Sequence, residues 1–218
     1  MAEVSENTVD LIYTSPPYNI GTAYQENKDD TSVSSYFVTL KQIFSECYRI
    51  LKSDGKLVIE VADTIRSQGA YIELAALIQA YCLDLGFVIE ERHINFVHTD
   101  HGKELPEHGW SADYIADGGA HSNCHQILVF SKNKETTFKD SGKVLYINYV
   151  STPEHPCPIP EAMQDFILAE YYKPGMTVAD PFMGTAGLGK RVMQMNGSFI
   201  GYELDSTIYK TAQAVLNG

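Results

Sequence analysis

Hydrophobic and polar residues along this chain fall into segments of two kinds. Short apolar runs such as residues 9–13 and 56–61 alternate with longer segments, such as 36–51, whose apolar positions recur every three or four residues. The first kind is typical of buried strands and the second of amphipathic helices. Their alternation predicts an α/β fold with a mostly parallel sheet and helices on both of its faces.

The same pattern predicts the other elements. Strands are expected at 87–98, 125–132, 177–179 and 198–202, an extended run at 144–149, and helices at 71–85, 161–172, 188–195 and 206–216. Residues 99–123 lose the pattern and are rich in Gly, His and Asp, with Trp110 as the single tryptophan. A long loop of this kind usually has a function or is disordered, and Trp110 could stack on a base or anchor the loop.

Length and composition restrict the class of protein. The 218 residues, 44% of them hydrophobic, suffice for one domain and leave little room for a second. We find neither a run of about 18 apolar residues nor a signal-peptide pattern, so we expect a cytoplasmic protein that has no membrane segment. The four cysteines lack CxxC spacing, and Cys47 and Cys82 fall in apolar helical patterns, which fits a reducing compartment.

The net charge of −12 argues against broad attraction to a phosphate backbone, which relies on Lys and Arg. A local basic strip is still conceivable, because four lysines fall close together in sequence: Lys132, Lys134, Lys139 and Lys143. A solvated loop would explain these four lysines equally well.

A stiff polar turn follows the predicted strand at 9–13. In Ser15-Pro16-Pro17-Tyr18, two successive prolines fix φ and cannot donate hydrogen bonds, so carbonyl oxygens are left exposed. Ser15 and the Pro16 carbonyl could accept hydrogens from an amino group and make its nitrogen more reactive. Tyr18 offers a face on which a flipped base could stack. An ordinary turn with an exposed tyrosine remains the alternative.

A glycine-rich turn at residues 180–187 lies between a predicted strand and a predicted helix. Glu203 ends the next predicted strand, near the roughly 20-residue spacing at which an acidic residue accepts ribose hydroxyls. The glycines form neither GxGxxG nor GxxxxGK[ST], which disfavours a dinucleotide enzyme or a phosphate loop. Tight packing of a helix on a strand would also account for them.

Together these motifs resemble those of the DNA amino-methyltransferases, enzymes that methylate N4 of cytosine or N6 of adenine. The catalytic, cofactor-capping, cofactor-loop and ribose motifs of that family resemble TSPPYN at 14–19, HPCPIP at 155–160, DPFMGTAG at 180–187 and FIGYELD at 199–205. The catalytic motif precedes the cofactor motifs, which is the permuted order found in the β group of that family. The resemblance implies a single Rossmann-like, circularly permuted domain over 1–218, with a catalytic half at about 1–134 and a cofactor half at about 155–218.

The resemblance also implies roles for particular residues. Ser15, Pro16, Pro17 and Tyr18 would handle the target base, and Ser15 favours cytosine N4 over adenine N6. The residues that would hold S-adenosyl-L-methionine are Asp180, Pro181, Phe182, Gly184, Thr185, Gly187, Glu203, His155, Pro156, Cys157 and Pro158. Direct in-line transfer to DNA is implied, in which the protein positions the reactants, as in a restriction-modification enzyme.

Three departures from the family pattern change these expectations. Family members of this order usually carry a strand and an adenine-contacting acidic residue well before the position of Asp10. These 218 residues contain neither, so we expect an adenine pocket that is incomplete or completed by another segment. The segment 134–155 has no sizeable target-recognition insertion, so specificity is low, or lies in 99–123 or in a separate partner. Residues 186–188 are Ala-Gly-Leu instead of the commoner Gly-Thr-Thr. A homodimer remains open.

Several potential metal ligands lie in or next to the long loop: His98, Asp100, His101, His108, His121, Cys124 and His125. None has HExxH or CxxC spacing, so a polar loop over the active site is the better explanation, and no metal is expected. Two other functions remain open. One is a methyltransferase that acts on RNA or a protein amide, and the other is a non-catalytic binding module of the same fold.

Overall fold

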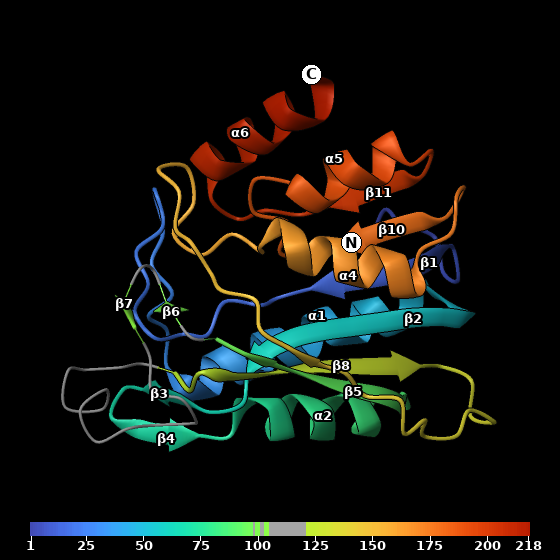
Figure 1. The fold of residues 1–218 in the computed structure, drawn as a ribbon, viewed down its shortest axis with the longest axis horizontal. Coiled ribbons are helices and arrows are strands. Elements are labelled where there is room, and N and C mark those ends of the chain that lie inside the picture. The colour runs from blue at the N-terminus through green and yellow to red at the C-terminus, as the bar shows by residue number, and fades with distance from the viewer. Residues whose placement is uncertain (98, 101–102, 105–120) are drawn as a thin grey trace.

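Seven strands form one sheet in the computed structural model, which describes residues 1–97, 99–100, 103–104 and 121–218. Their order across the sheet is β11-β10-β1-β2-β8-β5-β9 (Figure 1). The bounds are β1 Val9–Thr14, β2 Leu51–Ala62, β5 Val88–Phe96, β8 Cys124–Ser131, β9 Val144–Leu145, β10 Thr177–Asp180 and β11 Ser198–Gly201. All neighbours pair in parallel except β8, which is antiparallel to β2 and β5. The mostly parallel sheet is confirmed.

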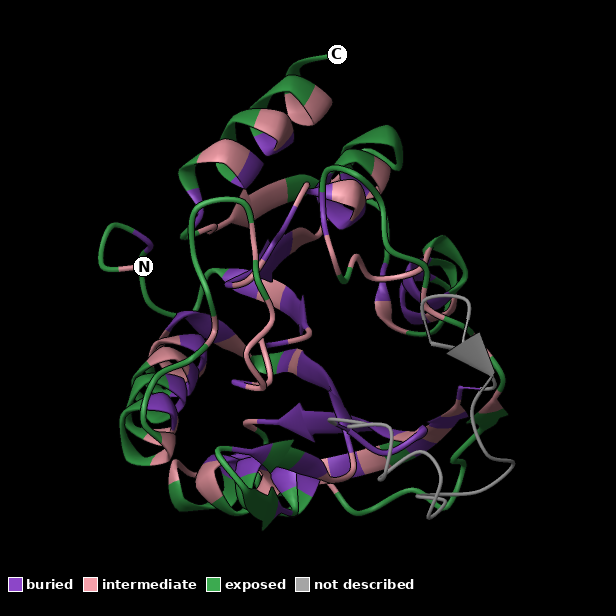
Figure 2. Cartoon of the chain, turned by 90° about the vertical axis from the view of Figure 1, so that its left-hand side faces the viewer, coloured by how far each residue is buried: buried purple, intermediate pink, exposed green. Residues whose placement is uncertain are grey.

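Helices cover both faces of this sheet, as predicted. They are α1 Val33–Ile50, α2 Leu74–Asp84, α4 Glu161–Tyr171, α5 Gly187–Gln194 and α6 Ser206–Asn217. Side chains alternate along β1: Ile12 packs with α1 and α2, whereas Leu11 and Tyr13 pack with α4 and α5. Figure 2 shows the buried positions gathered in the central strands and the exposed positions on the outer sides of the helices. Cys47 and Cys82 are buried in the core, as expected.

No helix within the described ranges has both the length and the apolar character needed to cross a membrane.

The structure corrects the prediction of a helix over 71–85. Residues Ala70–Ile72 form strand β4, which pairs antiparallel with β3 (Ile65–Ser67), and α2 begins only at Leu74. The two residues that connect these strands, Gln68 and Gly69, both have positive φ, of 49° and 81°. Such a two-residue turn favours a hairpin, so the chain reverses before the helix can start.

Two further expectations change. The strand expected at 56–61 begins earlier, because β2 also includes residues 51–55. There its pairing with β1 shifts register, and a Cβ at Gly55 would lie 2.9 Å from the Asp10 carbonyl oxygen. The expectation of a loop throughout 99–123 is wrong at two places, where the chain forms two short antiparallel strands, β6 Thr99–Asp100 and β7 Lys103–Glu104. Trp110 lies outside the described residues.

The structure also argues against a basic strip built from the lysines after β8. The Lys132 ammonium donates to the Leu51 carbonyl at 2.8 Å and lies over the Tyr48 ring. Lys139 and Lys143 form ion pairs with glutamates on neighbouring elements. Three of the four lysines are therefore paired within the molecule and do not form a continuous basic strip.

Gly189 allows α5 to pack closely on β11. A Cβ at this position would lie 2.4 Å from Cδ1 of Phe199 and 2.9 Å from Cδ2 of Leu216. We expect Gly189→Ala to lower the free energy of unfolding by about 1–3 kcal/mol, because overpacking outweighs the better helix propensity of alanine. Urea unfolding would measure this, with the exposed Lys190→Ala on the same helix as the control. A midpoint at or above that of the wild type would contradict the close packing.

Candidate active site

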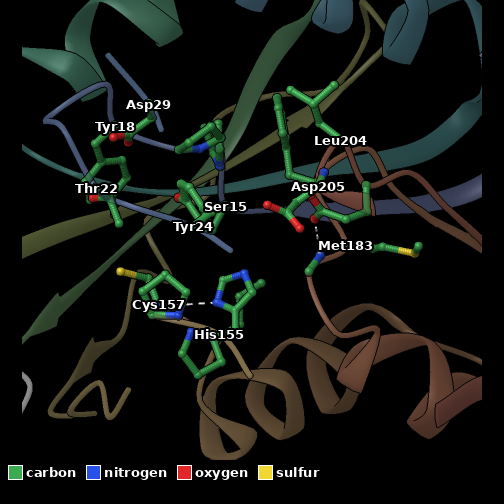
Figure 3. Close-up of a pocket in the computed structure, with 18 of the residues that line it drawn as sticks. Ser15, Tyr18, Thr22, Tyr24, Asp29, His155, Cys157, Met183, Leu204 and Asp205 are labelled. Carbon is green, nitrogen blue, oxygen red and sulfur yellow. Dashed lines mark hydrogen bonds between the residues drawn. The ribbon is translucent and has the colours of Figure 1, made fainter. Parts of the chain in front are cut away.

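A pocket of about 1110 Å³ opens at the carboxyl ends of β1, β10 and β11. The chain leaves β1 toward α1 on one face and leaves β10 toward α5 on the other, so these neighbours form a switch point, where open α/β sheets bind ligands. The pocket lining includes every residue predicted for the site: Ser15, Pro16, Pro17, Tyr18, His155, Pro156, Cys157, Pro158, Asp180, Pro181, Phe182, Gly184, Thr185, Gly187 and Glu203. In Figure 3 these segments face one another across the pocket.

The turn after β1 is held firmly on both sides. The Tyr36 hydroxyl donates to the Pro17 carbonyl at 2.7 Å, and the backbone N–H of Ala62 donates to the Tyr18 hydroxyl at 3.0 Å. Pro17 and Tyr18 are thereby fixed against α1 and against the end of β2. The Tyr18 ring is therefore positioned by the fold itself.

Aromatic rings gather around Tyr18. The rings of His121 and His125 lie 5.9 and 6.1 Å from the Tyr18 ring, and the ring of Tyr149 lies 5.0 Å from that of His125. All four residues line the pocket. The sequence singled out both histidines as metal candidates, but it gave no signal for Tyr149.

A metal site built from the histidine-rich region stays untested. Within the described part of the chain, no group of three or more His, Cys, Asp or Glu side chains is arranged to hold a metal ion. Three of the candidates, His98, His101 and His108, lie outside that part.

Asp180, which lines the pocket, joins the end of β1 to the glycine-rich loop. Its Oδ1 accepts hydrogen bonds from the Thr14 hydroxyl at 2.7 Å and from the Phe182 backbone N–H at 2.9 Å. Burial raises the pKa of the carboxyl to about 7, and the two hydrogen bonds oppose this rise. The end of β1 is thus tied to the start of the glycine-rich loop.

This pKa of Asp180 gives a pH-dependent prediction. Between the ordinary value of 3.8 and about 7, the folded protein binds a proton that the unfolded chain does not. On account of this group, the free energy of unfolding falls as the pH rises through this window and levels off above it. Asp180→Asn, whose amide oxygen can still accept from Thr14, should lack that fall. Its melting temperature relative to the wild type should therefore rise from about pH 5 to about pH 7.5, and a constant difference would contradict the raised pKa.

The glycine-rich loop wraps around His155. A Cβ at Gly184, whose φ is +53°, would lie 3.0 Å from Nε2 of His155. The backbone N–H of Cys157 donates to Nδ1 of His155 at 3.1 Å, and burial lowers the pKa of the imidazole to about 4. His155 is therefore neutral near pH 7 and carries its hydrogen on Nε2. Ala186, in place of the commoner glycine, adopts φ +60°, a left-handed conformation that costs about 1 kcal/mol.

Glu203 follows β11 and faces the same loop. Its Oε2 accepts from the Gly184 backbone N–H at 3.1 Å, and its Oε1 accepts from that of Asp205 at 2.8 Å. Burial raises the pKa of this carboxyl, and the backbone N–H groups oppose the rise. The next residue, Leu204, is 87% exposed, so a carboxylate and an apolar side chain stand together at the rim.

A wall of the pocket that the sequence did not indicate is the strap, which we define as residues 20–31. Oδ2 of Asp205 accepts from the backbone N–H groups of Glu26 at 2.6 Å and Asn27 at 3.2 Å, while its Oδ1 caps α6. The Asn19 side chain donates to the Thr31 carbonyl at 2.8 Å and closes the base of the strap. The strap thus connects the turn after β1 to the start of α6.

Comparisons with known proteins agree with this arrangement. A family model described as DNA methylase matches residues 9–214. The Type II methyltransferase M.BglII of Bacillus subtilis is 24% identical over 241 residues, which cover 100% of this chain and 66% of that protein. The DNA adenine methyltransferase YhdJ of Escherichia coli K12 is 22% identical over 96% of this chain and 76% of its own length. This chain therefore spans about two thirds to three quarters of these relatives.

Solved structures share the fold. One, described as a DNA modification methylase of Thermus thermophilus in complex with S-adenosyl-L-methionine, superposes with a TM-score of 0.69 at 20% identity. The superposition covers 99% of this chain and 88% of the Thermus thermophilus chain. The cytosine-N4-specific PvuII DNA methyltransferase gives a TM-score of 0.67 at 17% identity and covers 100% of this chain and 89% of its own.

Proposed function

This chain belongs to the DNA methylase family, and from that premise we propose that it transfers a methyl group from S-adenosyl-L-methionine to an exocyclic amino group of a DNA base, cytosine N4 in preference to adenine N6. The observation that carries the proposal is that two motifs meet in one pocket. The Ser-Pro-Pro-Tyr turn follows β1, the glycine-rich loop follows β10, and Glu203 follows β11.

The residues of the cofactor half fit S-adenosyl-L-methionine. Glu203 offers a carboxylate for ribose hydroxyls, and exposed Leu204 beside it offers an apolar surface for an adenine ring. Gly184 has no Cβ, so the loop backbone comes close to the His155 imidazole, and both residues border the pocket where the cofactor would lie. When bound, this cofactor supplies a methyl group activated by a positively charged sulfonium.

The residues of the catalytic half act on the base. The Ser15 hydroxyl and the Pro16 carbonyl accept the hydrogens of the amino group, which draws its lone pair out of conjugation with the ring. Tyr18, held by Ala62 and by the rings around it, supports a base that has left the helix. Transfer is direct, and the protein contributes by orienting the two reactants.

The choice of base rests on Ser15. The similar proteins include both a DNA adenine methyltransferase and a cytosine-N4-specific enzyme, so similarity alone favours neither base. Other members of the family have an aspartate at the position of Ser15. The neutral hydroxyl of Ser15 supports cytosine N4 as the target.

We further propose that residues 1–218 act as one methyltransferase domain. Its recognition of DNA sequence depends on residues 99–123 or on a separate specificity partner. The short segment 134–155 and the net charge of −12 support this division of labour.

The test is transfer of a labelled methyl group from S-adenosyl-L-methionine into DNA and RNA, with mass spectrometry of the nucleosides. We expect N4-methylcytosine in DNA and about 10-fold less product with Ser15→Ala, since one hydrogen bond to the amine is lost. Ser53→Ala, at an exposed serine away from the pocket, is the matched control. N6-methyladenine would overturn the choice of base, and label in RNA alone would overturn the DNA substrate.

A further inference from the structure

Glu60 is a fully buried acid that the mechanism above does not use. It lies two residues before the end of β2, opposite Ile127 of β8, and is 0% exposed. Its Oε2 accepts a hydrogen bond from the Tyr13 hydroxyl at 2.9 Å, and its Oε1 accepts one from the Tyr149 hydroxyl. A buried carboxyl is costly unless both of its oxygens are satisfied, and here two tyrosines satisfy them.

These contacts lead from Glu60 to the catalytic end of the pocket. Tyr149 lines the pocket, and its ring lies 5.0 Å from that of His125, whose Nδ1 is 3.5 Å from the Tyr18 hydroxyl. Two residues further along β2, the backbone N–H of Ala62 holds the same Tyr18 hydroxyl at 3.0 Å. One short stretch of β2 therefore holds Tyr18 through its backbone and Tyr149 through a side chain.

The surroundings of Glu60 match this role. Burial raises the pKa of Tyr13 and of Tyr149, so both hydroxyls remain donors. Burial also raises the pKa of Glu60 to about 7, and the two tyrosine hydrogen bonds oppose the rise. Ionisable groups near this cluster include Tyr18, His125 and Asp180. The buried side chains of α4 on this face do not ionise: Met163, Gln164, Ile167 and Leu168.

We propose that Glu60 is a positioning residue for the target base, because it fixes the Tyr149 ring as a wall of the subsite that faces Tyr18. This inference rests on the proposed function. Tyr13 immediately precedes the end of β1, and Tyr149 lies in the segment that leads to His155, so Glu60 links the two chain segments that border this subsite.

The test compares variants in steady-state methyl transfer to DNA. Tyr149→Phe keeps the ring and removes its anchor, and Glu60→Leu removes the anchor at its other end. We expect each to lower kcat/KM for DNA by about 10- to 100-fold, as a displacement of about 1 Å can do. The affinity for S-adenosyl-L-methionine should stay within about twofold of the wild type, because Glu203 and Gly184 are untouched. Tyr146→Phe, on an exposed tyrosine of the same segment, is the matched control.

Glu60→Gln separates positioning from a general structural role. Its amide oxygen can accept from one hydroxyl and its NH₂ can donate to the other, so it should restore kcat/KM to within about threefold of the wild type. Wild-type kinetics in Tyr149→Phe, equal losses in Glu60→Gln and Glu60→Leu, or a parallel loss of cofactor affinity would overturn the inference. If the wild type itself transfers no methyl group to DNA, the proposed function fails instead. Tyr149→Phe keeps the test decisive should Glu60→Leu not fold.

Discussion

Replacing Tyr18 with alanine is expected to lower kcat/KM for DNA methylation by about 10- to 100-fold, because a base stacked on an aromatic ring gains about 1–3 kcal/mol from it. Tyr18 also packs edge-on against His121 and His125, so its removal takes away the support of these two rings as well. Steady-state assays at saturating S-adenosyl-L-methionine would measure it, with DNA as the varied substrate.

Tyr18→Phe is the matched control for this prediction. It keeps the ring and removes only the hydroxyl that accepts from the Ala62 backbone N–H, a net contribution of about 1 kcal/mol. Its kcat/KM should therefore fall less than that of the alanine variant. Equal losses in both variants would point to the hydroxyl as the important group and would contradict base stacking.

Replacing Glu203 with alanine is expected to weaken binding of S-adenosyl-L-methionine by about 100-fold or more. Two charge-assisted hydrogen bonds to ribose hydroxyls would be lost, each contributing about 1.5–3 kcal/mol. The backbone N–H groups of Gly184 and Asp205 would also lose their acceptor, which loosens the glycine-rich loop.

Isothermal titration calorimetry with the cofactor alone would test this second prediction without any need for DNA. Glu154→Ala removes the same charge from an exposed position next to His155 and should bind as the wild type does. Glu203→Gln, which keeps one acceptor, should fall between the wild type and the alanine variant. An unchanged Kd in Glu203→Ala would show that the ribose lies elsewhere.

The strand and helix order was predictable because it depends on local periodicity. The site loops were predictable because Ser15-Pro16-Pro17-Tyr18 and the glycine-rich turn need particular backbone properties at consecutive positions. The switch point depends on the order of the strands across the sheet, which local periodicity does not predict, and the residues of both motifs line one pocket beside it.

What the sequence did not indicate depends on contacts between distant residues. Tyr149 and Glu60 are 89 positions apart, and Asp205 holds Glu26 across 179 positions, so no local pattern marks either pair. The hairpin around Gln68 did have a local signal in the sequence, because a turn-forming Gln-Gly pair precedes the predicted helix.

The pairing of β1 with β10 also bears on how the protein is made. The Thr14–Asp180 hydrogen bond spans 166 residues, which at about 5–20 residues per second the ribosome takes roughly 8–33 s to synthesise. During that interval β1 has emerged without its β10 neighbour, and an apolar strand edge is open to wrong pairing. The nascent chain therefore gains its pocket only near the end of translation, and chaperones that shield strand edges should affect its yield more than they affect that of proteins with local sheets.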